Sequence, residues 1–356
     1  MKKLIKLNNL IIILVALTFV LQSCKKSVDY IAYNGNIYTV NNDFDKASAF
    51  AVKDGIFIDV GDDKILSKYN TKEKINLNES TVLPGLIDAH CHFYGLGLNQ
   101  SVIDLTGTNS FNEILEKISL KDNENIIRGR GWDQNDWKIK EFPNKTKLDL
   151  LYPNTPVVLE RIDGHAYLVN QRALEIAKID VNTKVDNGTI IIENGKLTGV
   201  LIDGPMSLID MAFGEVSLDD KIKALMSAQE ICFKHGLTTV DDAGLSKDVI
   251  LLVDSLQKEK KLKMRIYAMI SNIENDVNYF LKSGPIKTNS LNVRSVKVYG
   301  DGALGSRGAT LKEPYSDDNH NYGKLVTDVE SIKILAKKLS EADFQMNNHA
   351  IGDSTV

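Results

Sequence analysis

The sequence predicts an α/β protein with a small β-domain in front of it. Residues 28–80 contain short strand-forming runs separated by the turn dipeptides Asn34-Gly35 and Asp54-Gly55, and the apolar runs on both sides of Asp54-Gly55 predict a hairpin there. From Thr81 onward apolar strand patterns alternate with helical patterns, which indicates a parallel sheet. With 43% apolar and 25% charged residues, the chain can bury a sizeable core. We therefore expect a β-domain over 24–80 and an α/β domain over 81–356.

The expected strands of the α/β domain are separated unevenly along the chain. A long excursion over 98–216 follows the first strand and carries its own hairpin, turned by Asn194-Gly195. Ser217 and Gly236 have the residue types that begin and end a helix, and Thr327 with Glu330 predicts a capping box for another. The strands are expected at 82–90, 238–241, 264–270, 295–299 and 344–349.

The N-terminus has the pattern of an export signal. Three lysines in the first six residues precede an apolar run over 10–21 that is too short to span a bilayer. The run ends in Leu21-Gln22-Ser23-Cys24, which resembles a bacterial lipobox and predicts a signal peptide over 1–23 with lipidation of Cys24. An ordinary secretory signal with an incidental cysteine is the alternative. We expect a lipoprotein held in the membrane of a bacterial envelope, outside the cytoplasm.

The overall charge is acidic. The net charge of −4 becomes −7 once the signal and its three lysines are removed, which argues against nucleic acid as a partner. After Cys24 only Cys91 and Cys232 remain, and neither has a neighbouring cysteine, so we expect no disulfide framework.

A His-x-His pair stands at the end of the first expected α/β strand. Strand side chains alternate between faces, so His90 and His92 project to the same side and Cys91 projects away from them. Two neutral imidazoles at a strand exit suit a divalent metal, most often zinc. The alternative is a polar pair with no ligand role.

Seven motifs follow one another along the chain: Asn34–Thr39, Val52–Ile56, Pro84–His92, Arg130–Trp137, Glu160–Ala166, Asp301–Ser306 and His349–Asp353. Together they resemble the amidohydrolase superfamily and its amidohydrolase-3, or YtcJ-like, group. This resemblance implies a (β/α)₈ barrel preceded by a small β-domain that C-terminal strands complete. Because the chain ends at Val356, after the fifth expected strand, we expect an incomplete barrel, the N-terminal two-thirds of a larger enzyme.

The same resemblance implies further metal ligands. Lys297 takes the position of a strand lysine that CO₂ carboxylates, so that the carbamate bridges two metals, and His349 takes that of the next strand's ligand. Lys297 and His349, with His90 and His92, are thus expected to hold one or two zinc-like ions and to serve catalysis. The alternative for Lys297 is an ion pair with Asp301 or a nearby acid. The family's later ligands and its usual general base have no counterpart before Val356.

The excursion offers candidates for substrate contact. Trp132, Trp137 and His165 are expected to form a lid over the site, with His165 and Trp132 binding substrate. The alternative is that the tryptophans pack the excursion and that His165 satisfies a local hydrogen bond. His235 and His320 are expected to be structural or solvated.

These features together predict a metal-dependent amidohydrolase that cleaves a non-peptide C–N bond of a small-molecule amide or formamide by metal-activated water. One alternative is a non-catalytic, lipid-anchored binding or remnant protein. Another is a metal carrier that uses only His90 and His92, which leaves Lys297 and His349 unexplained.

Overall fold

The computed structural model describes residues 25–120, 125–185, 187–214 and 216–356. The chain divides into two compact units, one up to Leu86 and one from Ile87 onward. Cys24 and the expected signal peptide lie outside the described residues. Within the described part, no helix combines the length and apolarity needed to cross a membrane.

The first unit is built from two small sheets. One has the order β5-β4-β1-β6 and the other the order β3-β2-β7. The expected hairpin is present, because β4 and β5 pair antiparallel and both turn residues, Asp54 and Gly55, have positive φ. Its elements are β1 (Tyr30–Tyr33), β2 (Asn36–Tyr38), β3 (Lys46–Ala47), β4 (Ala49–Lys53), β5 (Ile56–Gly61), α2 (Ile65–Lys68), β6 (Glu73–Asn76) and β7 (Thr81–Val82).

The main sheet of the second unit contains all the strands expected for the α/β domain. Its order is β17-β18-β16-β15-β8, with β19 on the other side of β18, and the pairs β15–β16, β16–β18 and β18–β19 are parallel. The strands are β8 (Leu86–Cys91), β15 (Leu237–Leu245), β16 (Arg265–Ser271), β17 (Ile286–Lys287), β18 (Leu291–Tyr299) and β19 (Gln345–His349).

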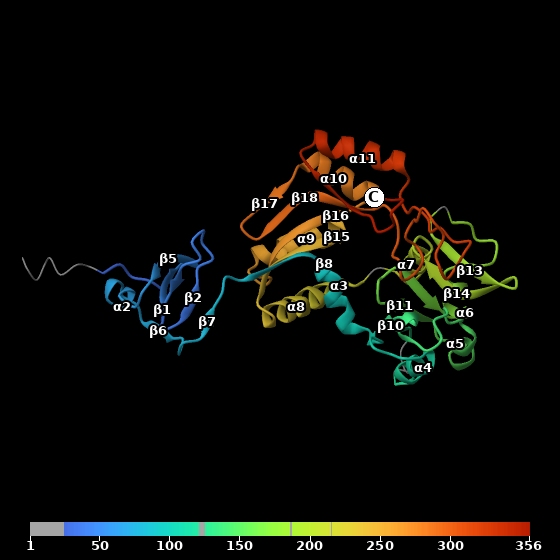
Figure 1. Ribbon diagram of the computed structural model, residues 1–356, viewed down its shortest axis with the longest axis horizontal. Helices are drawn as coiled ribbons and strands as arrows, with labels where there is room; N and C mark the ends of the chain where they lie inside the picture. Colours follow the sequence, from blue (N-terminus) through green and yellow to red (C-terminus); the bar gives the residue numbers. More distant parts are fainter. Residues whose placement is uncertain (1–24, 121–124, 186, 215) are drawn as a thin grey trace, which may run out of the picture. The chain divides into compact units, whose positions relative to one another are not determined.

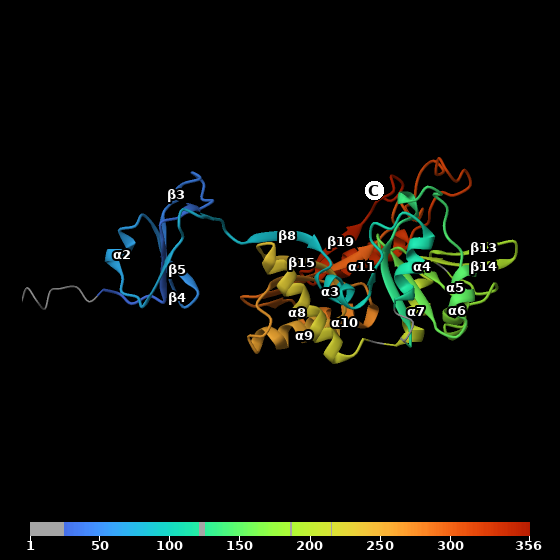
Figure 2. The same ribbon diagram turned by 90° about the horizontal axis from the view of Figure 1, so that it is seen from below.

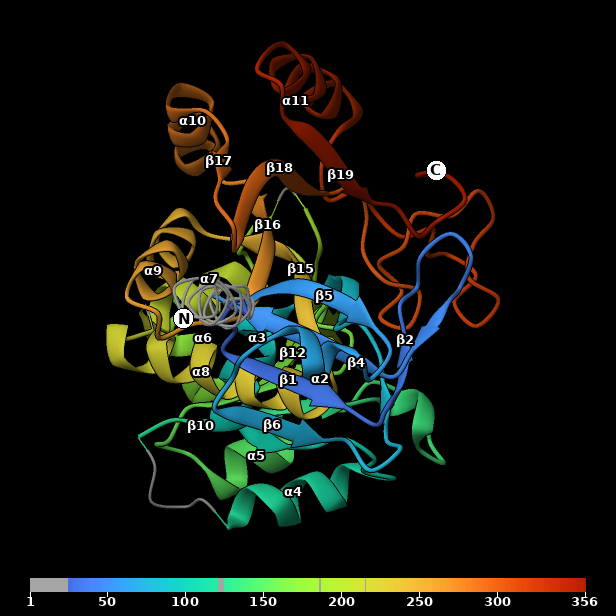
Figure 3. The same cartoon turned by 90° about the vertical axis from the view of Figure 1, so that its left-hand side faces the viewer.

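Helices cover one face of this sheet (Figures 1 and 3). Apolar residues of alternate strand positions, such as Val296 and Val298, pack with Leu225, Val253 and Phe280 from the helices in one buried core. The opposite face of β18 is therefore left to Ser295, Lys297 and Tyr299. The helices are α8 (Leu218–Lys234), α9 (Lys247–Lys258), α10 (Glu274–Ser283) and α11 (Val329–Glu341).

The excursion forms a second sheet with its own helices and cores. The order is β13-β14-β12-β11-β10-β9, and the β13–β14 hairpin predicted from Asn194-Gly195 is present. The helix α3 (Phe93–Leu98) precedes the excursion and packs in the core of the main sheet. The elements that follow it are η1 (Asn99–Ser101), β9 (Ile103–Asp104), α4 (Phe111–Ser119), β10 (Ile127–Trp132), η2 (Gln134–Asp136), α5 (Thr146–Leu151), β11 (Val157–Arg161), β12 (Ala166–Val169), α6 (Gln171–Ile176), β13 (Thr189–Glu193), β14 (Lys196–Ile202) and α7 (Met206–Phe213). Figure 2 shows α3 following β8 directly.

Two local expectations were wrong. The first strand of the α/β domain begins at Leu86 instead of residue 82, because β7 pairs with β2 in the first unit and Pro84 cannot donate to a sheet ladder. The cap of α11 is Asp328, which accepts from the N–H of Ser331, because the hydroxyl of Thr327 instead donates to the carbonyl of Tyr299. By contrast, Ser217 caps α8 as expected.

Candidate metal and substrate site

His90 and His92 lie together at the end of β8. Their ring centroids are 6.0 Å apart, and both residues are exposed. Cys91 between them packs against the core on the helix side, as the strand alternation requires. Although His92 is exposed, neighbouring protein atoms partly desolvate its ring, and the nearby basic groups of Lys297, His90 and Arg130 add to this effect. The pKa of His92 is therefore held below its usual value. The neutral imidazole that a metal requires is therefore favoured at this position.

Lys297 lies on the sheet face that the helices do not cover, and it is 3% exposed. Burial lowers the pKa of its amine. Among the described residues no carboxylate lies within salt-bridge distance of Nζ, which instead lies 5.1 Å from the centroid of the Tyr299 ring. A buried lysine without an acidic partner is costly as a cation, so this position favours the uncharged amine.

Asp301 does not neutralise Lys297. Its carboxylate accepts hydrogen bonds from the N–H groups of Thr310, Ile351 and Gly352 and from the hydroxyl of Thr355, at 2.8–3.0 Å. Burial opposes the charge, but these four donors outweigh it and lower the pKa of Asp301. Asp301 thus fastens the segment that follows His349 to the loop after β18.

His349 ends β19 in register with Tyr299 of β18, and their ring centroids are 5.6 Å apart. Its Nε2 is buried and has no hydrogen-bond partner among the described residues. Burial lowers the pKa of His349, and the electrostatic effect of the neighbouring His165 lowers it further. A buried ring nitrogen without a hydrogen-bond partner is available to ligate a metal ion.

The donor types fit a zinc-like ion, although the structure does not close them into one ligand cage. No three His, Cys, Asp or Glu side chains converge as a metal site in the described ranges. Lys297 is the common neighbour, because its amine is close enough to both His92 and His349 for a positive charge on it to lower the pKa of each ring. The four predicted ligands therefore comprise one close pair, His90 and His92, and two neighbouring side chains, Lys297 and His349, on the open face of the sheet.

The excursion adds His165 to this face. Its ring centroid is 5.3 Å from that of His349 and 6.2 Å from that of Tyr299. Its Nδ1 is 2.6 Å from Oδ1 of Asp203. Burial opposes protonation of His165, but the hydrogen bond and charge of Asp203 outweigh it and raise the pKa.

The substrate contact expected of Trp132 was wrong. Trp132 is fully buried in the excursion core, and its indole N–H donates to the carbonyl of Leu159 at 2.9 Å. Trp137 packs in the same core and donates to the carbonyl of Thr108 at 3.0 Å. Both indole rings are packed in this core and both indole N–H groups are hydrogen-bonded within it, so neither tryptophan forms a lid. His235 ends α8 as its C-cap residue and His320 is exposed, as expected of structural or solvated histidines.

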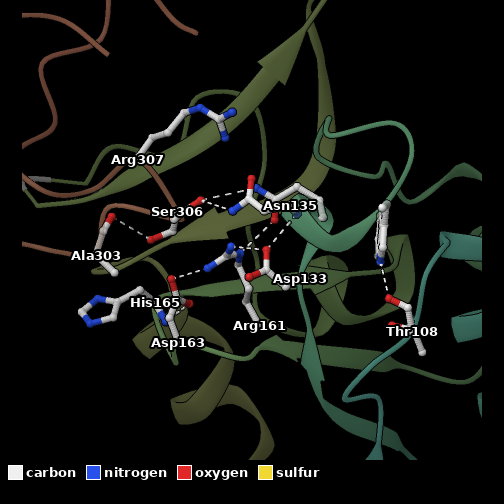
Figure 4. Close-up of polar contacts among 12 residues, drawn as sticks. Thr108, Asp133, Asn135, Arg161, Asp163, His165, Ala303, Ser306 and Arg307 are labelled. Atoms are coloured by element: carbon white, nitrogen blue, oxygen red, sulfur yellow. Dashed lines mark hydrogen bonds and ion pairs between the residues drawn. The ribbon is translucent and has the colours of Figure 1, made fainter. Parts of the chain in front are cut away.

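A buried arginine, Arg161, holds together excursion side chains that lie beside the loop after β18 (Figure 4). The Arg161 guanidinium forms ion pairs with Asp133 and Asp163, and its Nε donates to Gln134 at 2.9 Å. The guanidinium also lies against Gly305, where a Cβ would approach it to 2.9 Å. This contact explains the glycine in the Asp301–Ser306 motif.

Sequence reasoning missed Asp203, Asp242, Tyr299 and Arg161. Arg161 and Tyr299 lie inside or beside a motif, whereas Asp203 and Asp242 do not. The role of each depends on contacts that only the tertiary fold creates. Asp242 and Arg161 are buried charged residues in apolar strand patterns. A charged residue in such a pattern was the one sequence signal that could have identified them as candidates.

The family model of the amidohydrolase family matches residues 73–356, which is most of the chain. The chain belongs to this family. YtcJ of Bacillus subtilis, whose name assigns it to the amidohydrolases, is 33% identical over 90% of this chain and 63% of its own length. The Arabidopsis thaliana protein LONG AFTER FAR-RED 3 is 31% identical over 91% of this chain and 59% of its own length. The chain thus spans about three-fifths of these relatives.

Solved structures agree with this assignment. An uncharacterized metal-dependent hydrolase from Pyrococcus horikoshii superposes with a TM-score of 0.69 at 27% identity, over 92% of this chain and 66% of that one. A second one, from Pyrococcus furiosus, gives 0.65 at 25% identity, over 92% and 68%. The mixed α/β fold of this chain therefore matches that of metal-dependent hydrolases.

Proposed function

We propose that this protein is a metal-dependent hydrolase that cleaves a non-peptide C–N bond in a small-molecule amide or formamide. Membership of the amidohydrolase family supports the reaction class. The N-substituted formamide deformylase of Arthrobacter pascens, 27% identical over 60% of this chain and 42% of its own length, supports the substrate class. The observation that carries the proposal is the buried, unpartnered Nε2 of His349 beside the acid-free amine of Lys297.

In this proposal His90, His92, Lys297 and His349 hold one or two divalent ions, with zinc as the expected metal. When bound, such an ion lowers the pKa of a water molecule toward 7 and polarises the scissile carbonyl. The low pKa of Lys297 supports its carboxylation, because only the uncharged amine adds to CO₂, giving a carbamate and releasing one proton. The carbamate supplies two oxygen donors where the unmodified amine supplies one nitrogen.

We also propose that the strands β8, β15, β16, β18 and β19 are the first five of a (β/α)₈ barrel. Their parallel pairing and the helices on one face support this arrangement. The site residues then lie at the carboxyl ends of their strands, where active sites of this fold occur.

A hydrolysis screen of the full-length protein tests the function. The substrates are N-substituted formamides, cyclic amides and N-acyl amino acids, each measured with zinc present and after chelation. We expect turnover of at least one class that chelation abolishes and zinc restores. Stable binding of an amide without turnover would favour the alternative, a non-catalytic binding protein.

For location we propose a lipid anchor at Cys24 in a bacterial envelope membrane. The support is the lipobox-like Leu21–Cys24 segment behind a basic and apolar leader. More than one acyl chain gives stable attachment, whereas one chain binds only marginally.

A further inference from the structure

In the described part of the chain, His165 is the only residue of the excursion whose aromatic ring lies against the ring of His349. It lies in the turn between β11 and β12, far along the chain from both Tyr299 and His349. Its side chain is 13% exposed, so it is largely enclosed but still reachable. Figure 4 shows the His165 ring directed away from the Arg161 network.

Asp203 fixes how this ring is presented. A carboxylate only accepts hydrogen bonds, so the 2.6 Å contact with Oδ1 requires the proton on Nδ1. The main chain reinforces the pair, because the N–H of Asp203 donates to the carbonyl of His165 at 3.1 Å. The ring therefore keeps Nε2 as its free polar atom, and Nε2 has no hydrogen-bond partner in the part of the chain that the structure describes.

The loop after β18 holds Asp203 in turn. A Cβ at Gly302 would come within 2.5 Å of Oδ2 of Asp203, and one at Gly308 within 2.7 Å. The carboxylate thus occupies space that only two glycines leave open. Asp203 itself has a φ of 58°, a backbone conformation that is uncommon outside glycine. Such a conformation is retained where the surroundings enforce it.

We infer that His165, oriented by Asp203, is a substrate-contacting residue whose Nε2 hydrogen-bonds the amide group of a substrate held at the face formed by Lys297, Tyr299 and His349. A purely structural histidine would use both ring nitrogens internally or bury the second one. Here one nitrogen is fixed and the other is left accessible beside a proposed metal ligand. The inference rests on the proposed function and adds the excursion's own residue to the site.

Two substitutions separate the ring nitrogens. In His165→Asn the amide replaces Nδ1 and keeps the contact with Asp203, but nothing reaches the place of Nε2. In His165→Gln the longer amide places a polar atom near Nε2 and gives up the fixed orientation. His320→Asn, at an exposed histidine outside the site, is the matched control.

The first experiment compares steady-state kinetics of the zinc-loaded full-length variants on N-butylformamide and on the best substrate of the screen. Loss of one hydrogen bond is worth about a tenfold change. We expect kcat/KM to fall about tenfold or more in His165→Asn, to be partly retained in His165→Gln and to be unchanged in His320→Asn. Zinc content should equal that of the wild type in all three. Equal kcat/KM in wild type and His165→Asn would overturn the inference and leave the proposed function standing.

The second experiment does not depend on catalysis. Saturation-transfer NMR measures binding of N-butylformamide, a lactam and an N-acyl amino acid to metal-free protein. We expect weaker binding to His165→Asn than to wild type for the amides that bind, whether or not any is hydrolysed. Equal binding to the two proteins, or no binding of any amide to wild type, would overturn the inference.

Discussion

The carboxylate of Asp242 on β15 accepts a hydrogen bond of 2.9 Å from the main-chain N–H of Tyr94, in the first turn of α3. Asp242 is 1% exposed, and α3 begins immediately after His92. The other end of this short helix is also fixed, because Gly97 packs directly on the main chain of Ala224 in α8. A six-residue helix held at both ends determines where His92 leaves the sheet.

Removing the Asp242 carboxylate should therefore loosen His92. We expect Asp242→Ala to lower the free energy of unfolding by about 1–3 kcal/mol, because it leaves a buried N–H unsatisfied, and to weaken zinc binding. Asp242→Asn retains an acceptor oxygen and should change both less. Denaturant unfolding and zinc titration measure the effects, with Asp43→Ala at an exposed position as the control. Wild-type zinc affinity in Asp242→Ala would refute this role.

The ion pairs of Arg161 should stabilise the excursion from within. Arg161→Met leaves the carboxylates of Asp133 and Asp163 without their cation in a largely buried site. We expect the free energy of unfolding to fall by about 3–5 kcal/mol. Thermal or denaturant unfolding measures this loss. Arg172→Met, which breaks an exposed pair with Glu175, should cost less than about 1 kcal/mol. Equal losses in the two variants would show that burial does not strengthen the Arg161 link.

Asp301 should make stability sensitive to acid. Because its pKa is lowered in the folded state, its contribution is complete above the ordinary carboxyl value of 3.8 and is lost as the pH falls through the folded value. Asp301→Asn turns an NH₂ group toward a main-chain donor and should cost about 1.5–3 kcal/mol near pH 7. The difference from wild type should shrink below about pH 4, as measured by denaturant unfolding at several pH values. A difference independent of pH would contradict the assigned charge.

The lipid anchor is tested by Cys24→Ser in a bacterial host. Without the thiol that receives the lipid, the protein should accumulate as unprocessed precursor or leave the membrane fraction. Fractionation and the mass of the N-terminal peptide report the outcome, with Cys232→Ser as a control because that buried thiol lies in α8. Membrane-bound, processed Cys24→Ser protein would show that the lipobox interpretation is wrong.

Local patterns were sufficient for the strands, the two hairpins and the face that carries His90 and His92. These features depend on strand alternation and on turn residues such as Asp54-Gly55, which act over a few positions. The partners of Asp242, Arg161 and His165 were not predictable, because each contact joins segments that only the tertiary fold brings together. The role of Trp132 was not predictable for a similar reason. A tryptophan in a motif can pack in a core or bind substrate, and only the fold shows that Trp132 packs. At Thr327 a long-range hydrogen bond to Tyr299 displaced the expected local cap.

The most direct test of the proposed metal site is the zinc content of the full-length protein. Wild type, His90→Ala, His349→Ala and the control His320→Ala are purified with zinc supplied, dialysed and analysed by inductively coupled plasma mass spectrometry. We expect one or two ions per wild-type and His320→Ala chain and a clear loss in both His90→Ala and His349→Ala. Zinc content equal to wild type in both His90→Ala and His349→Ala would contradict the metal site, and with it the proposed hydrolase.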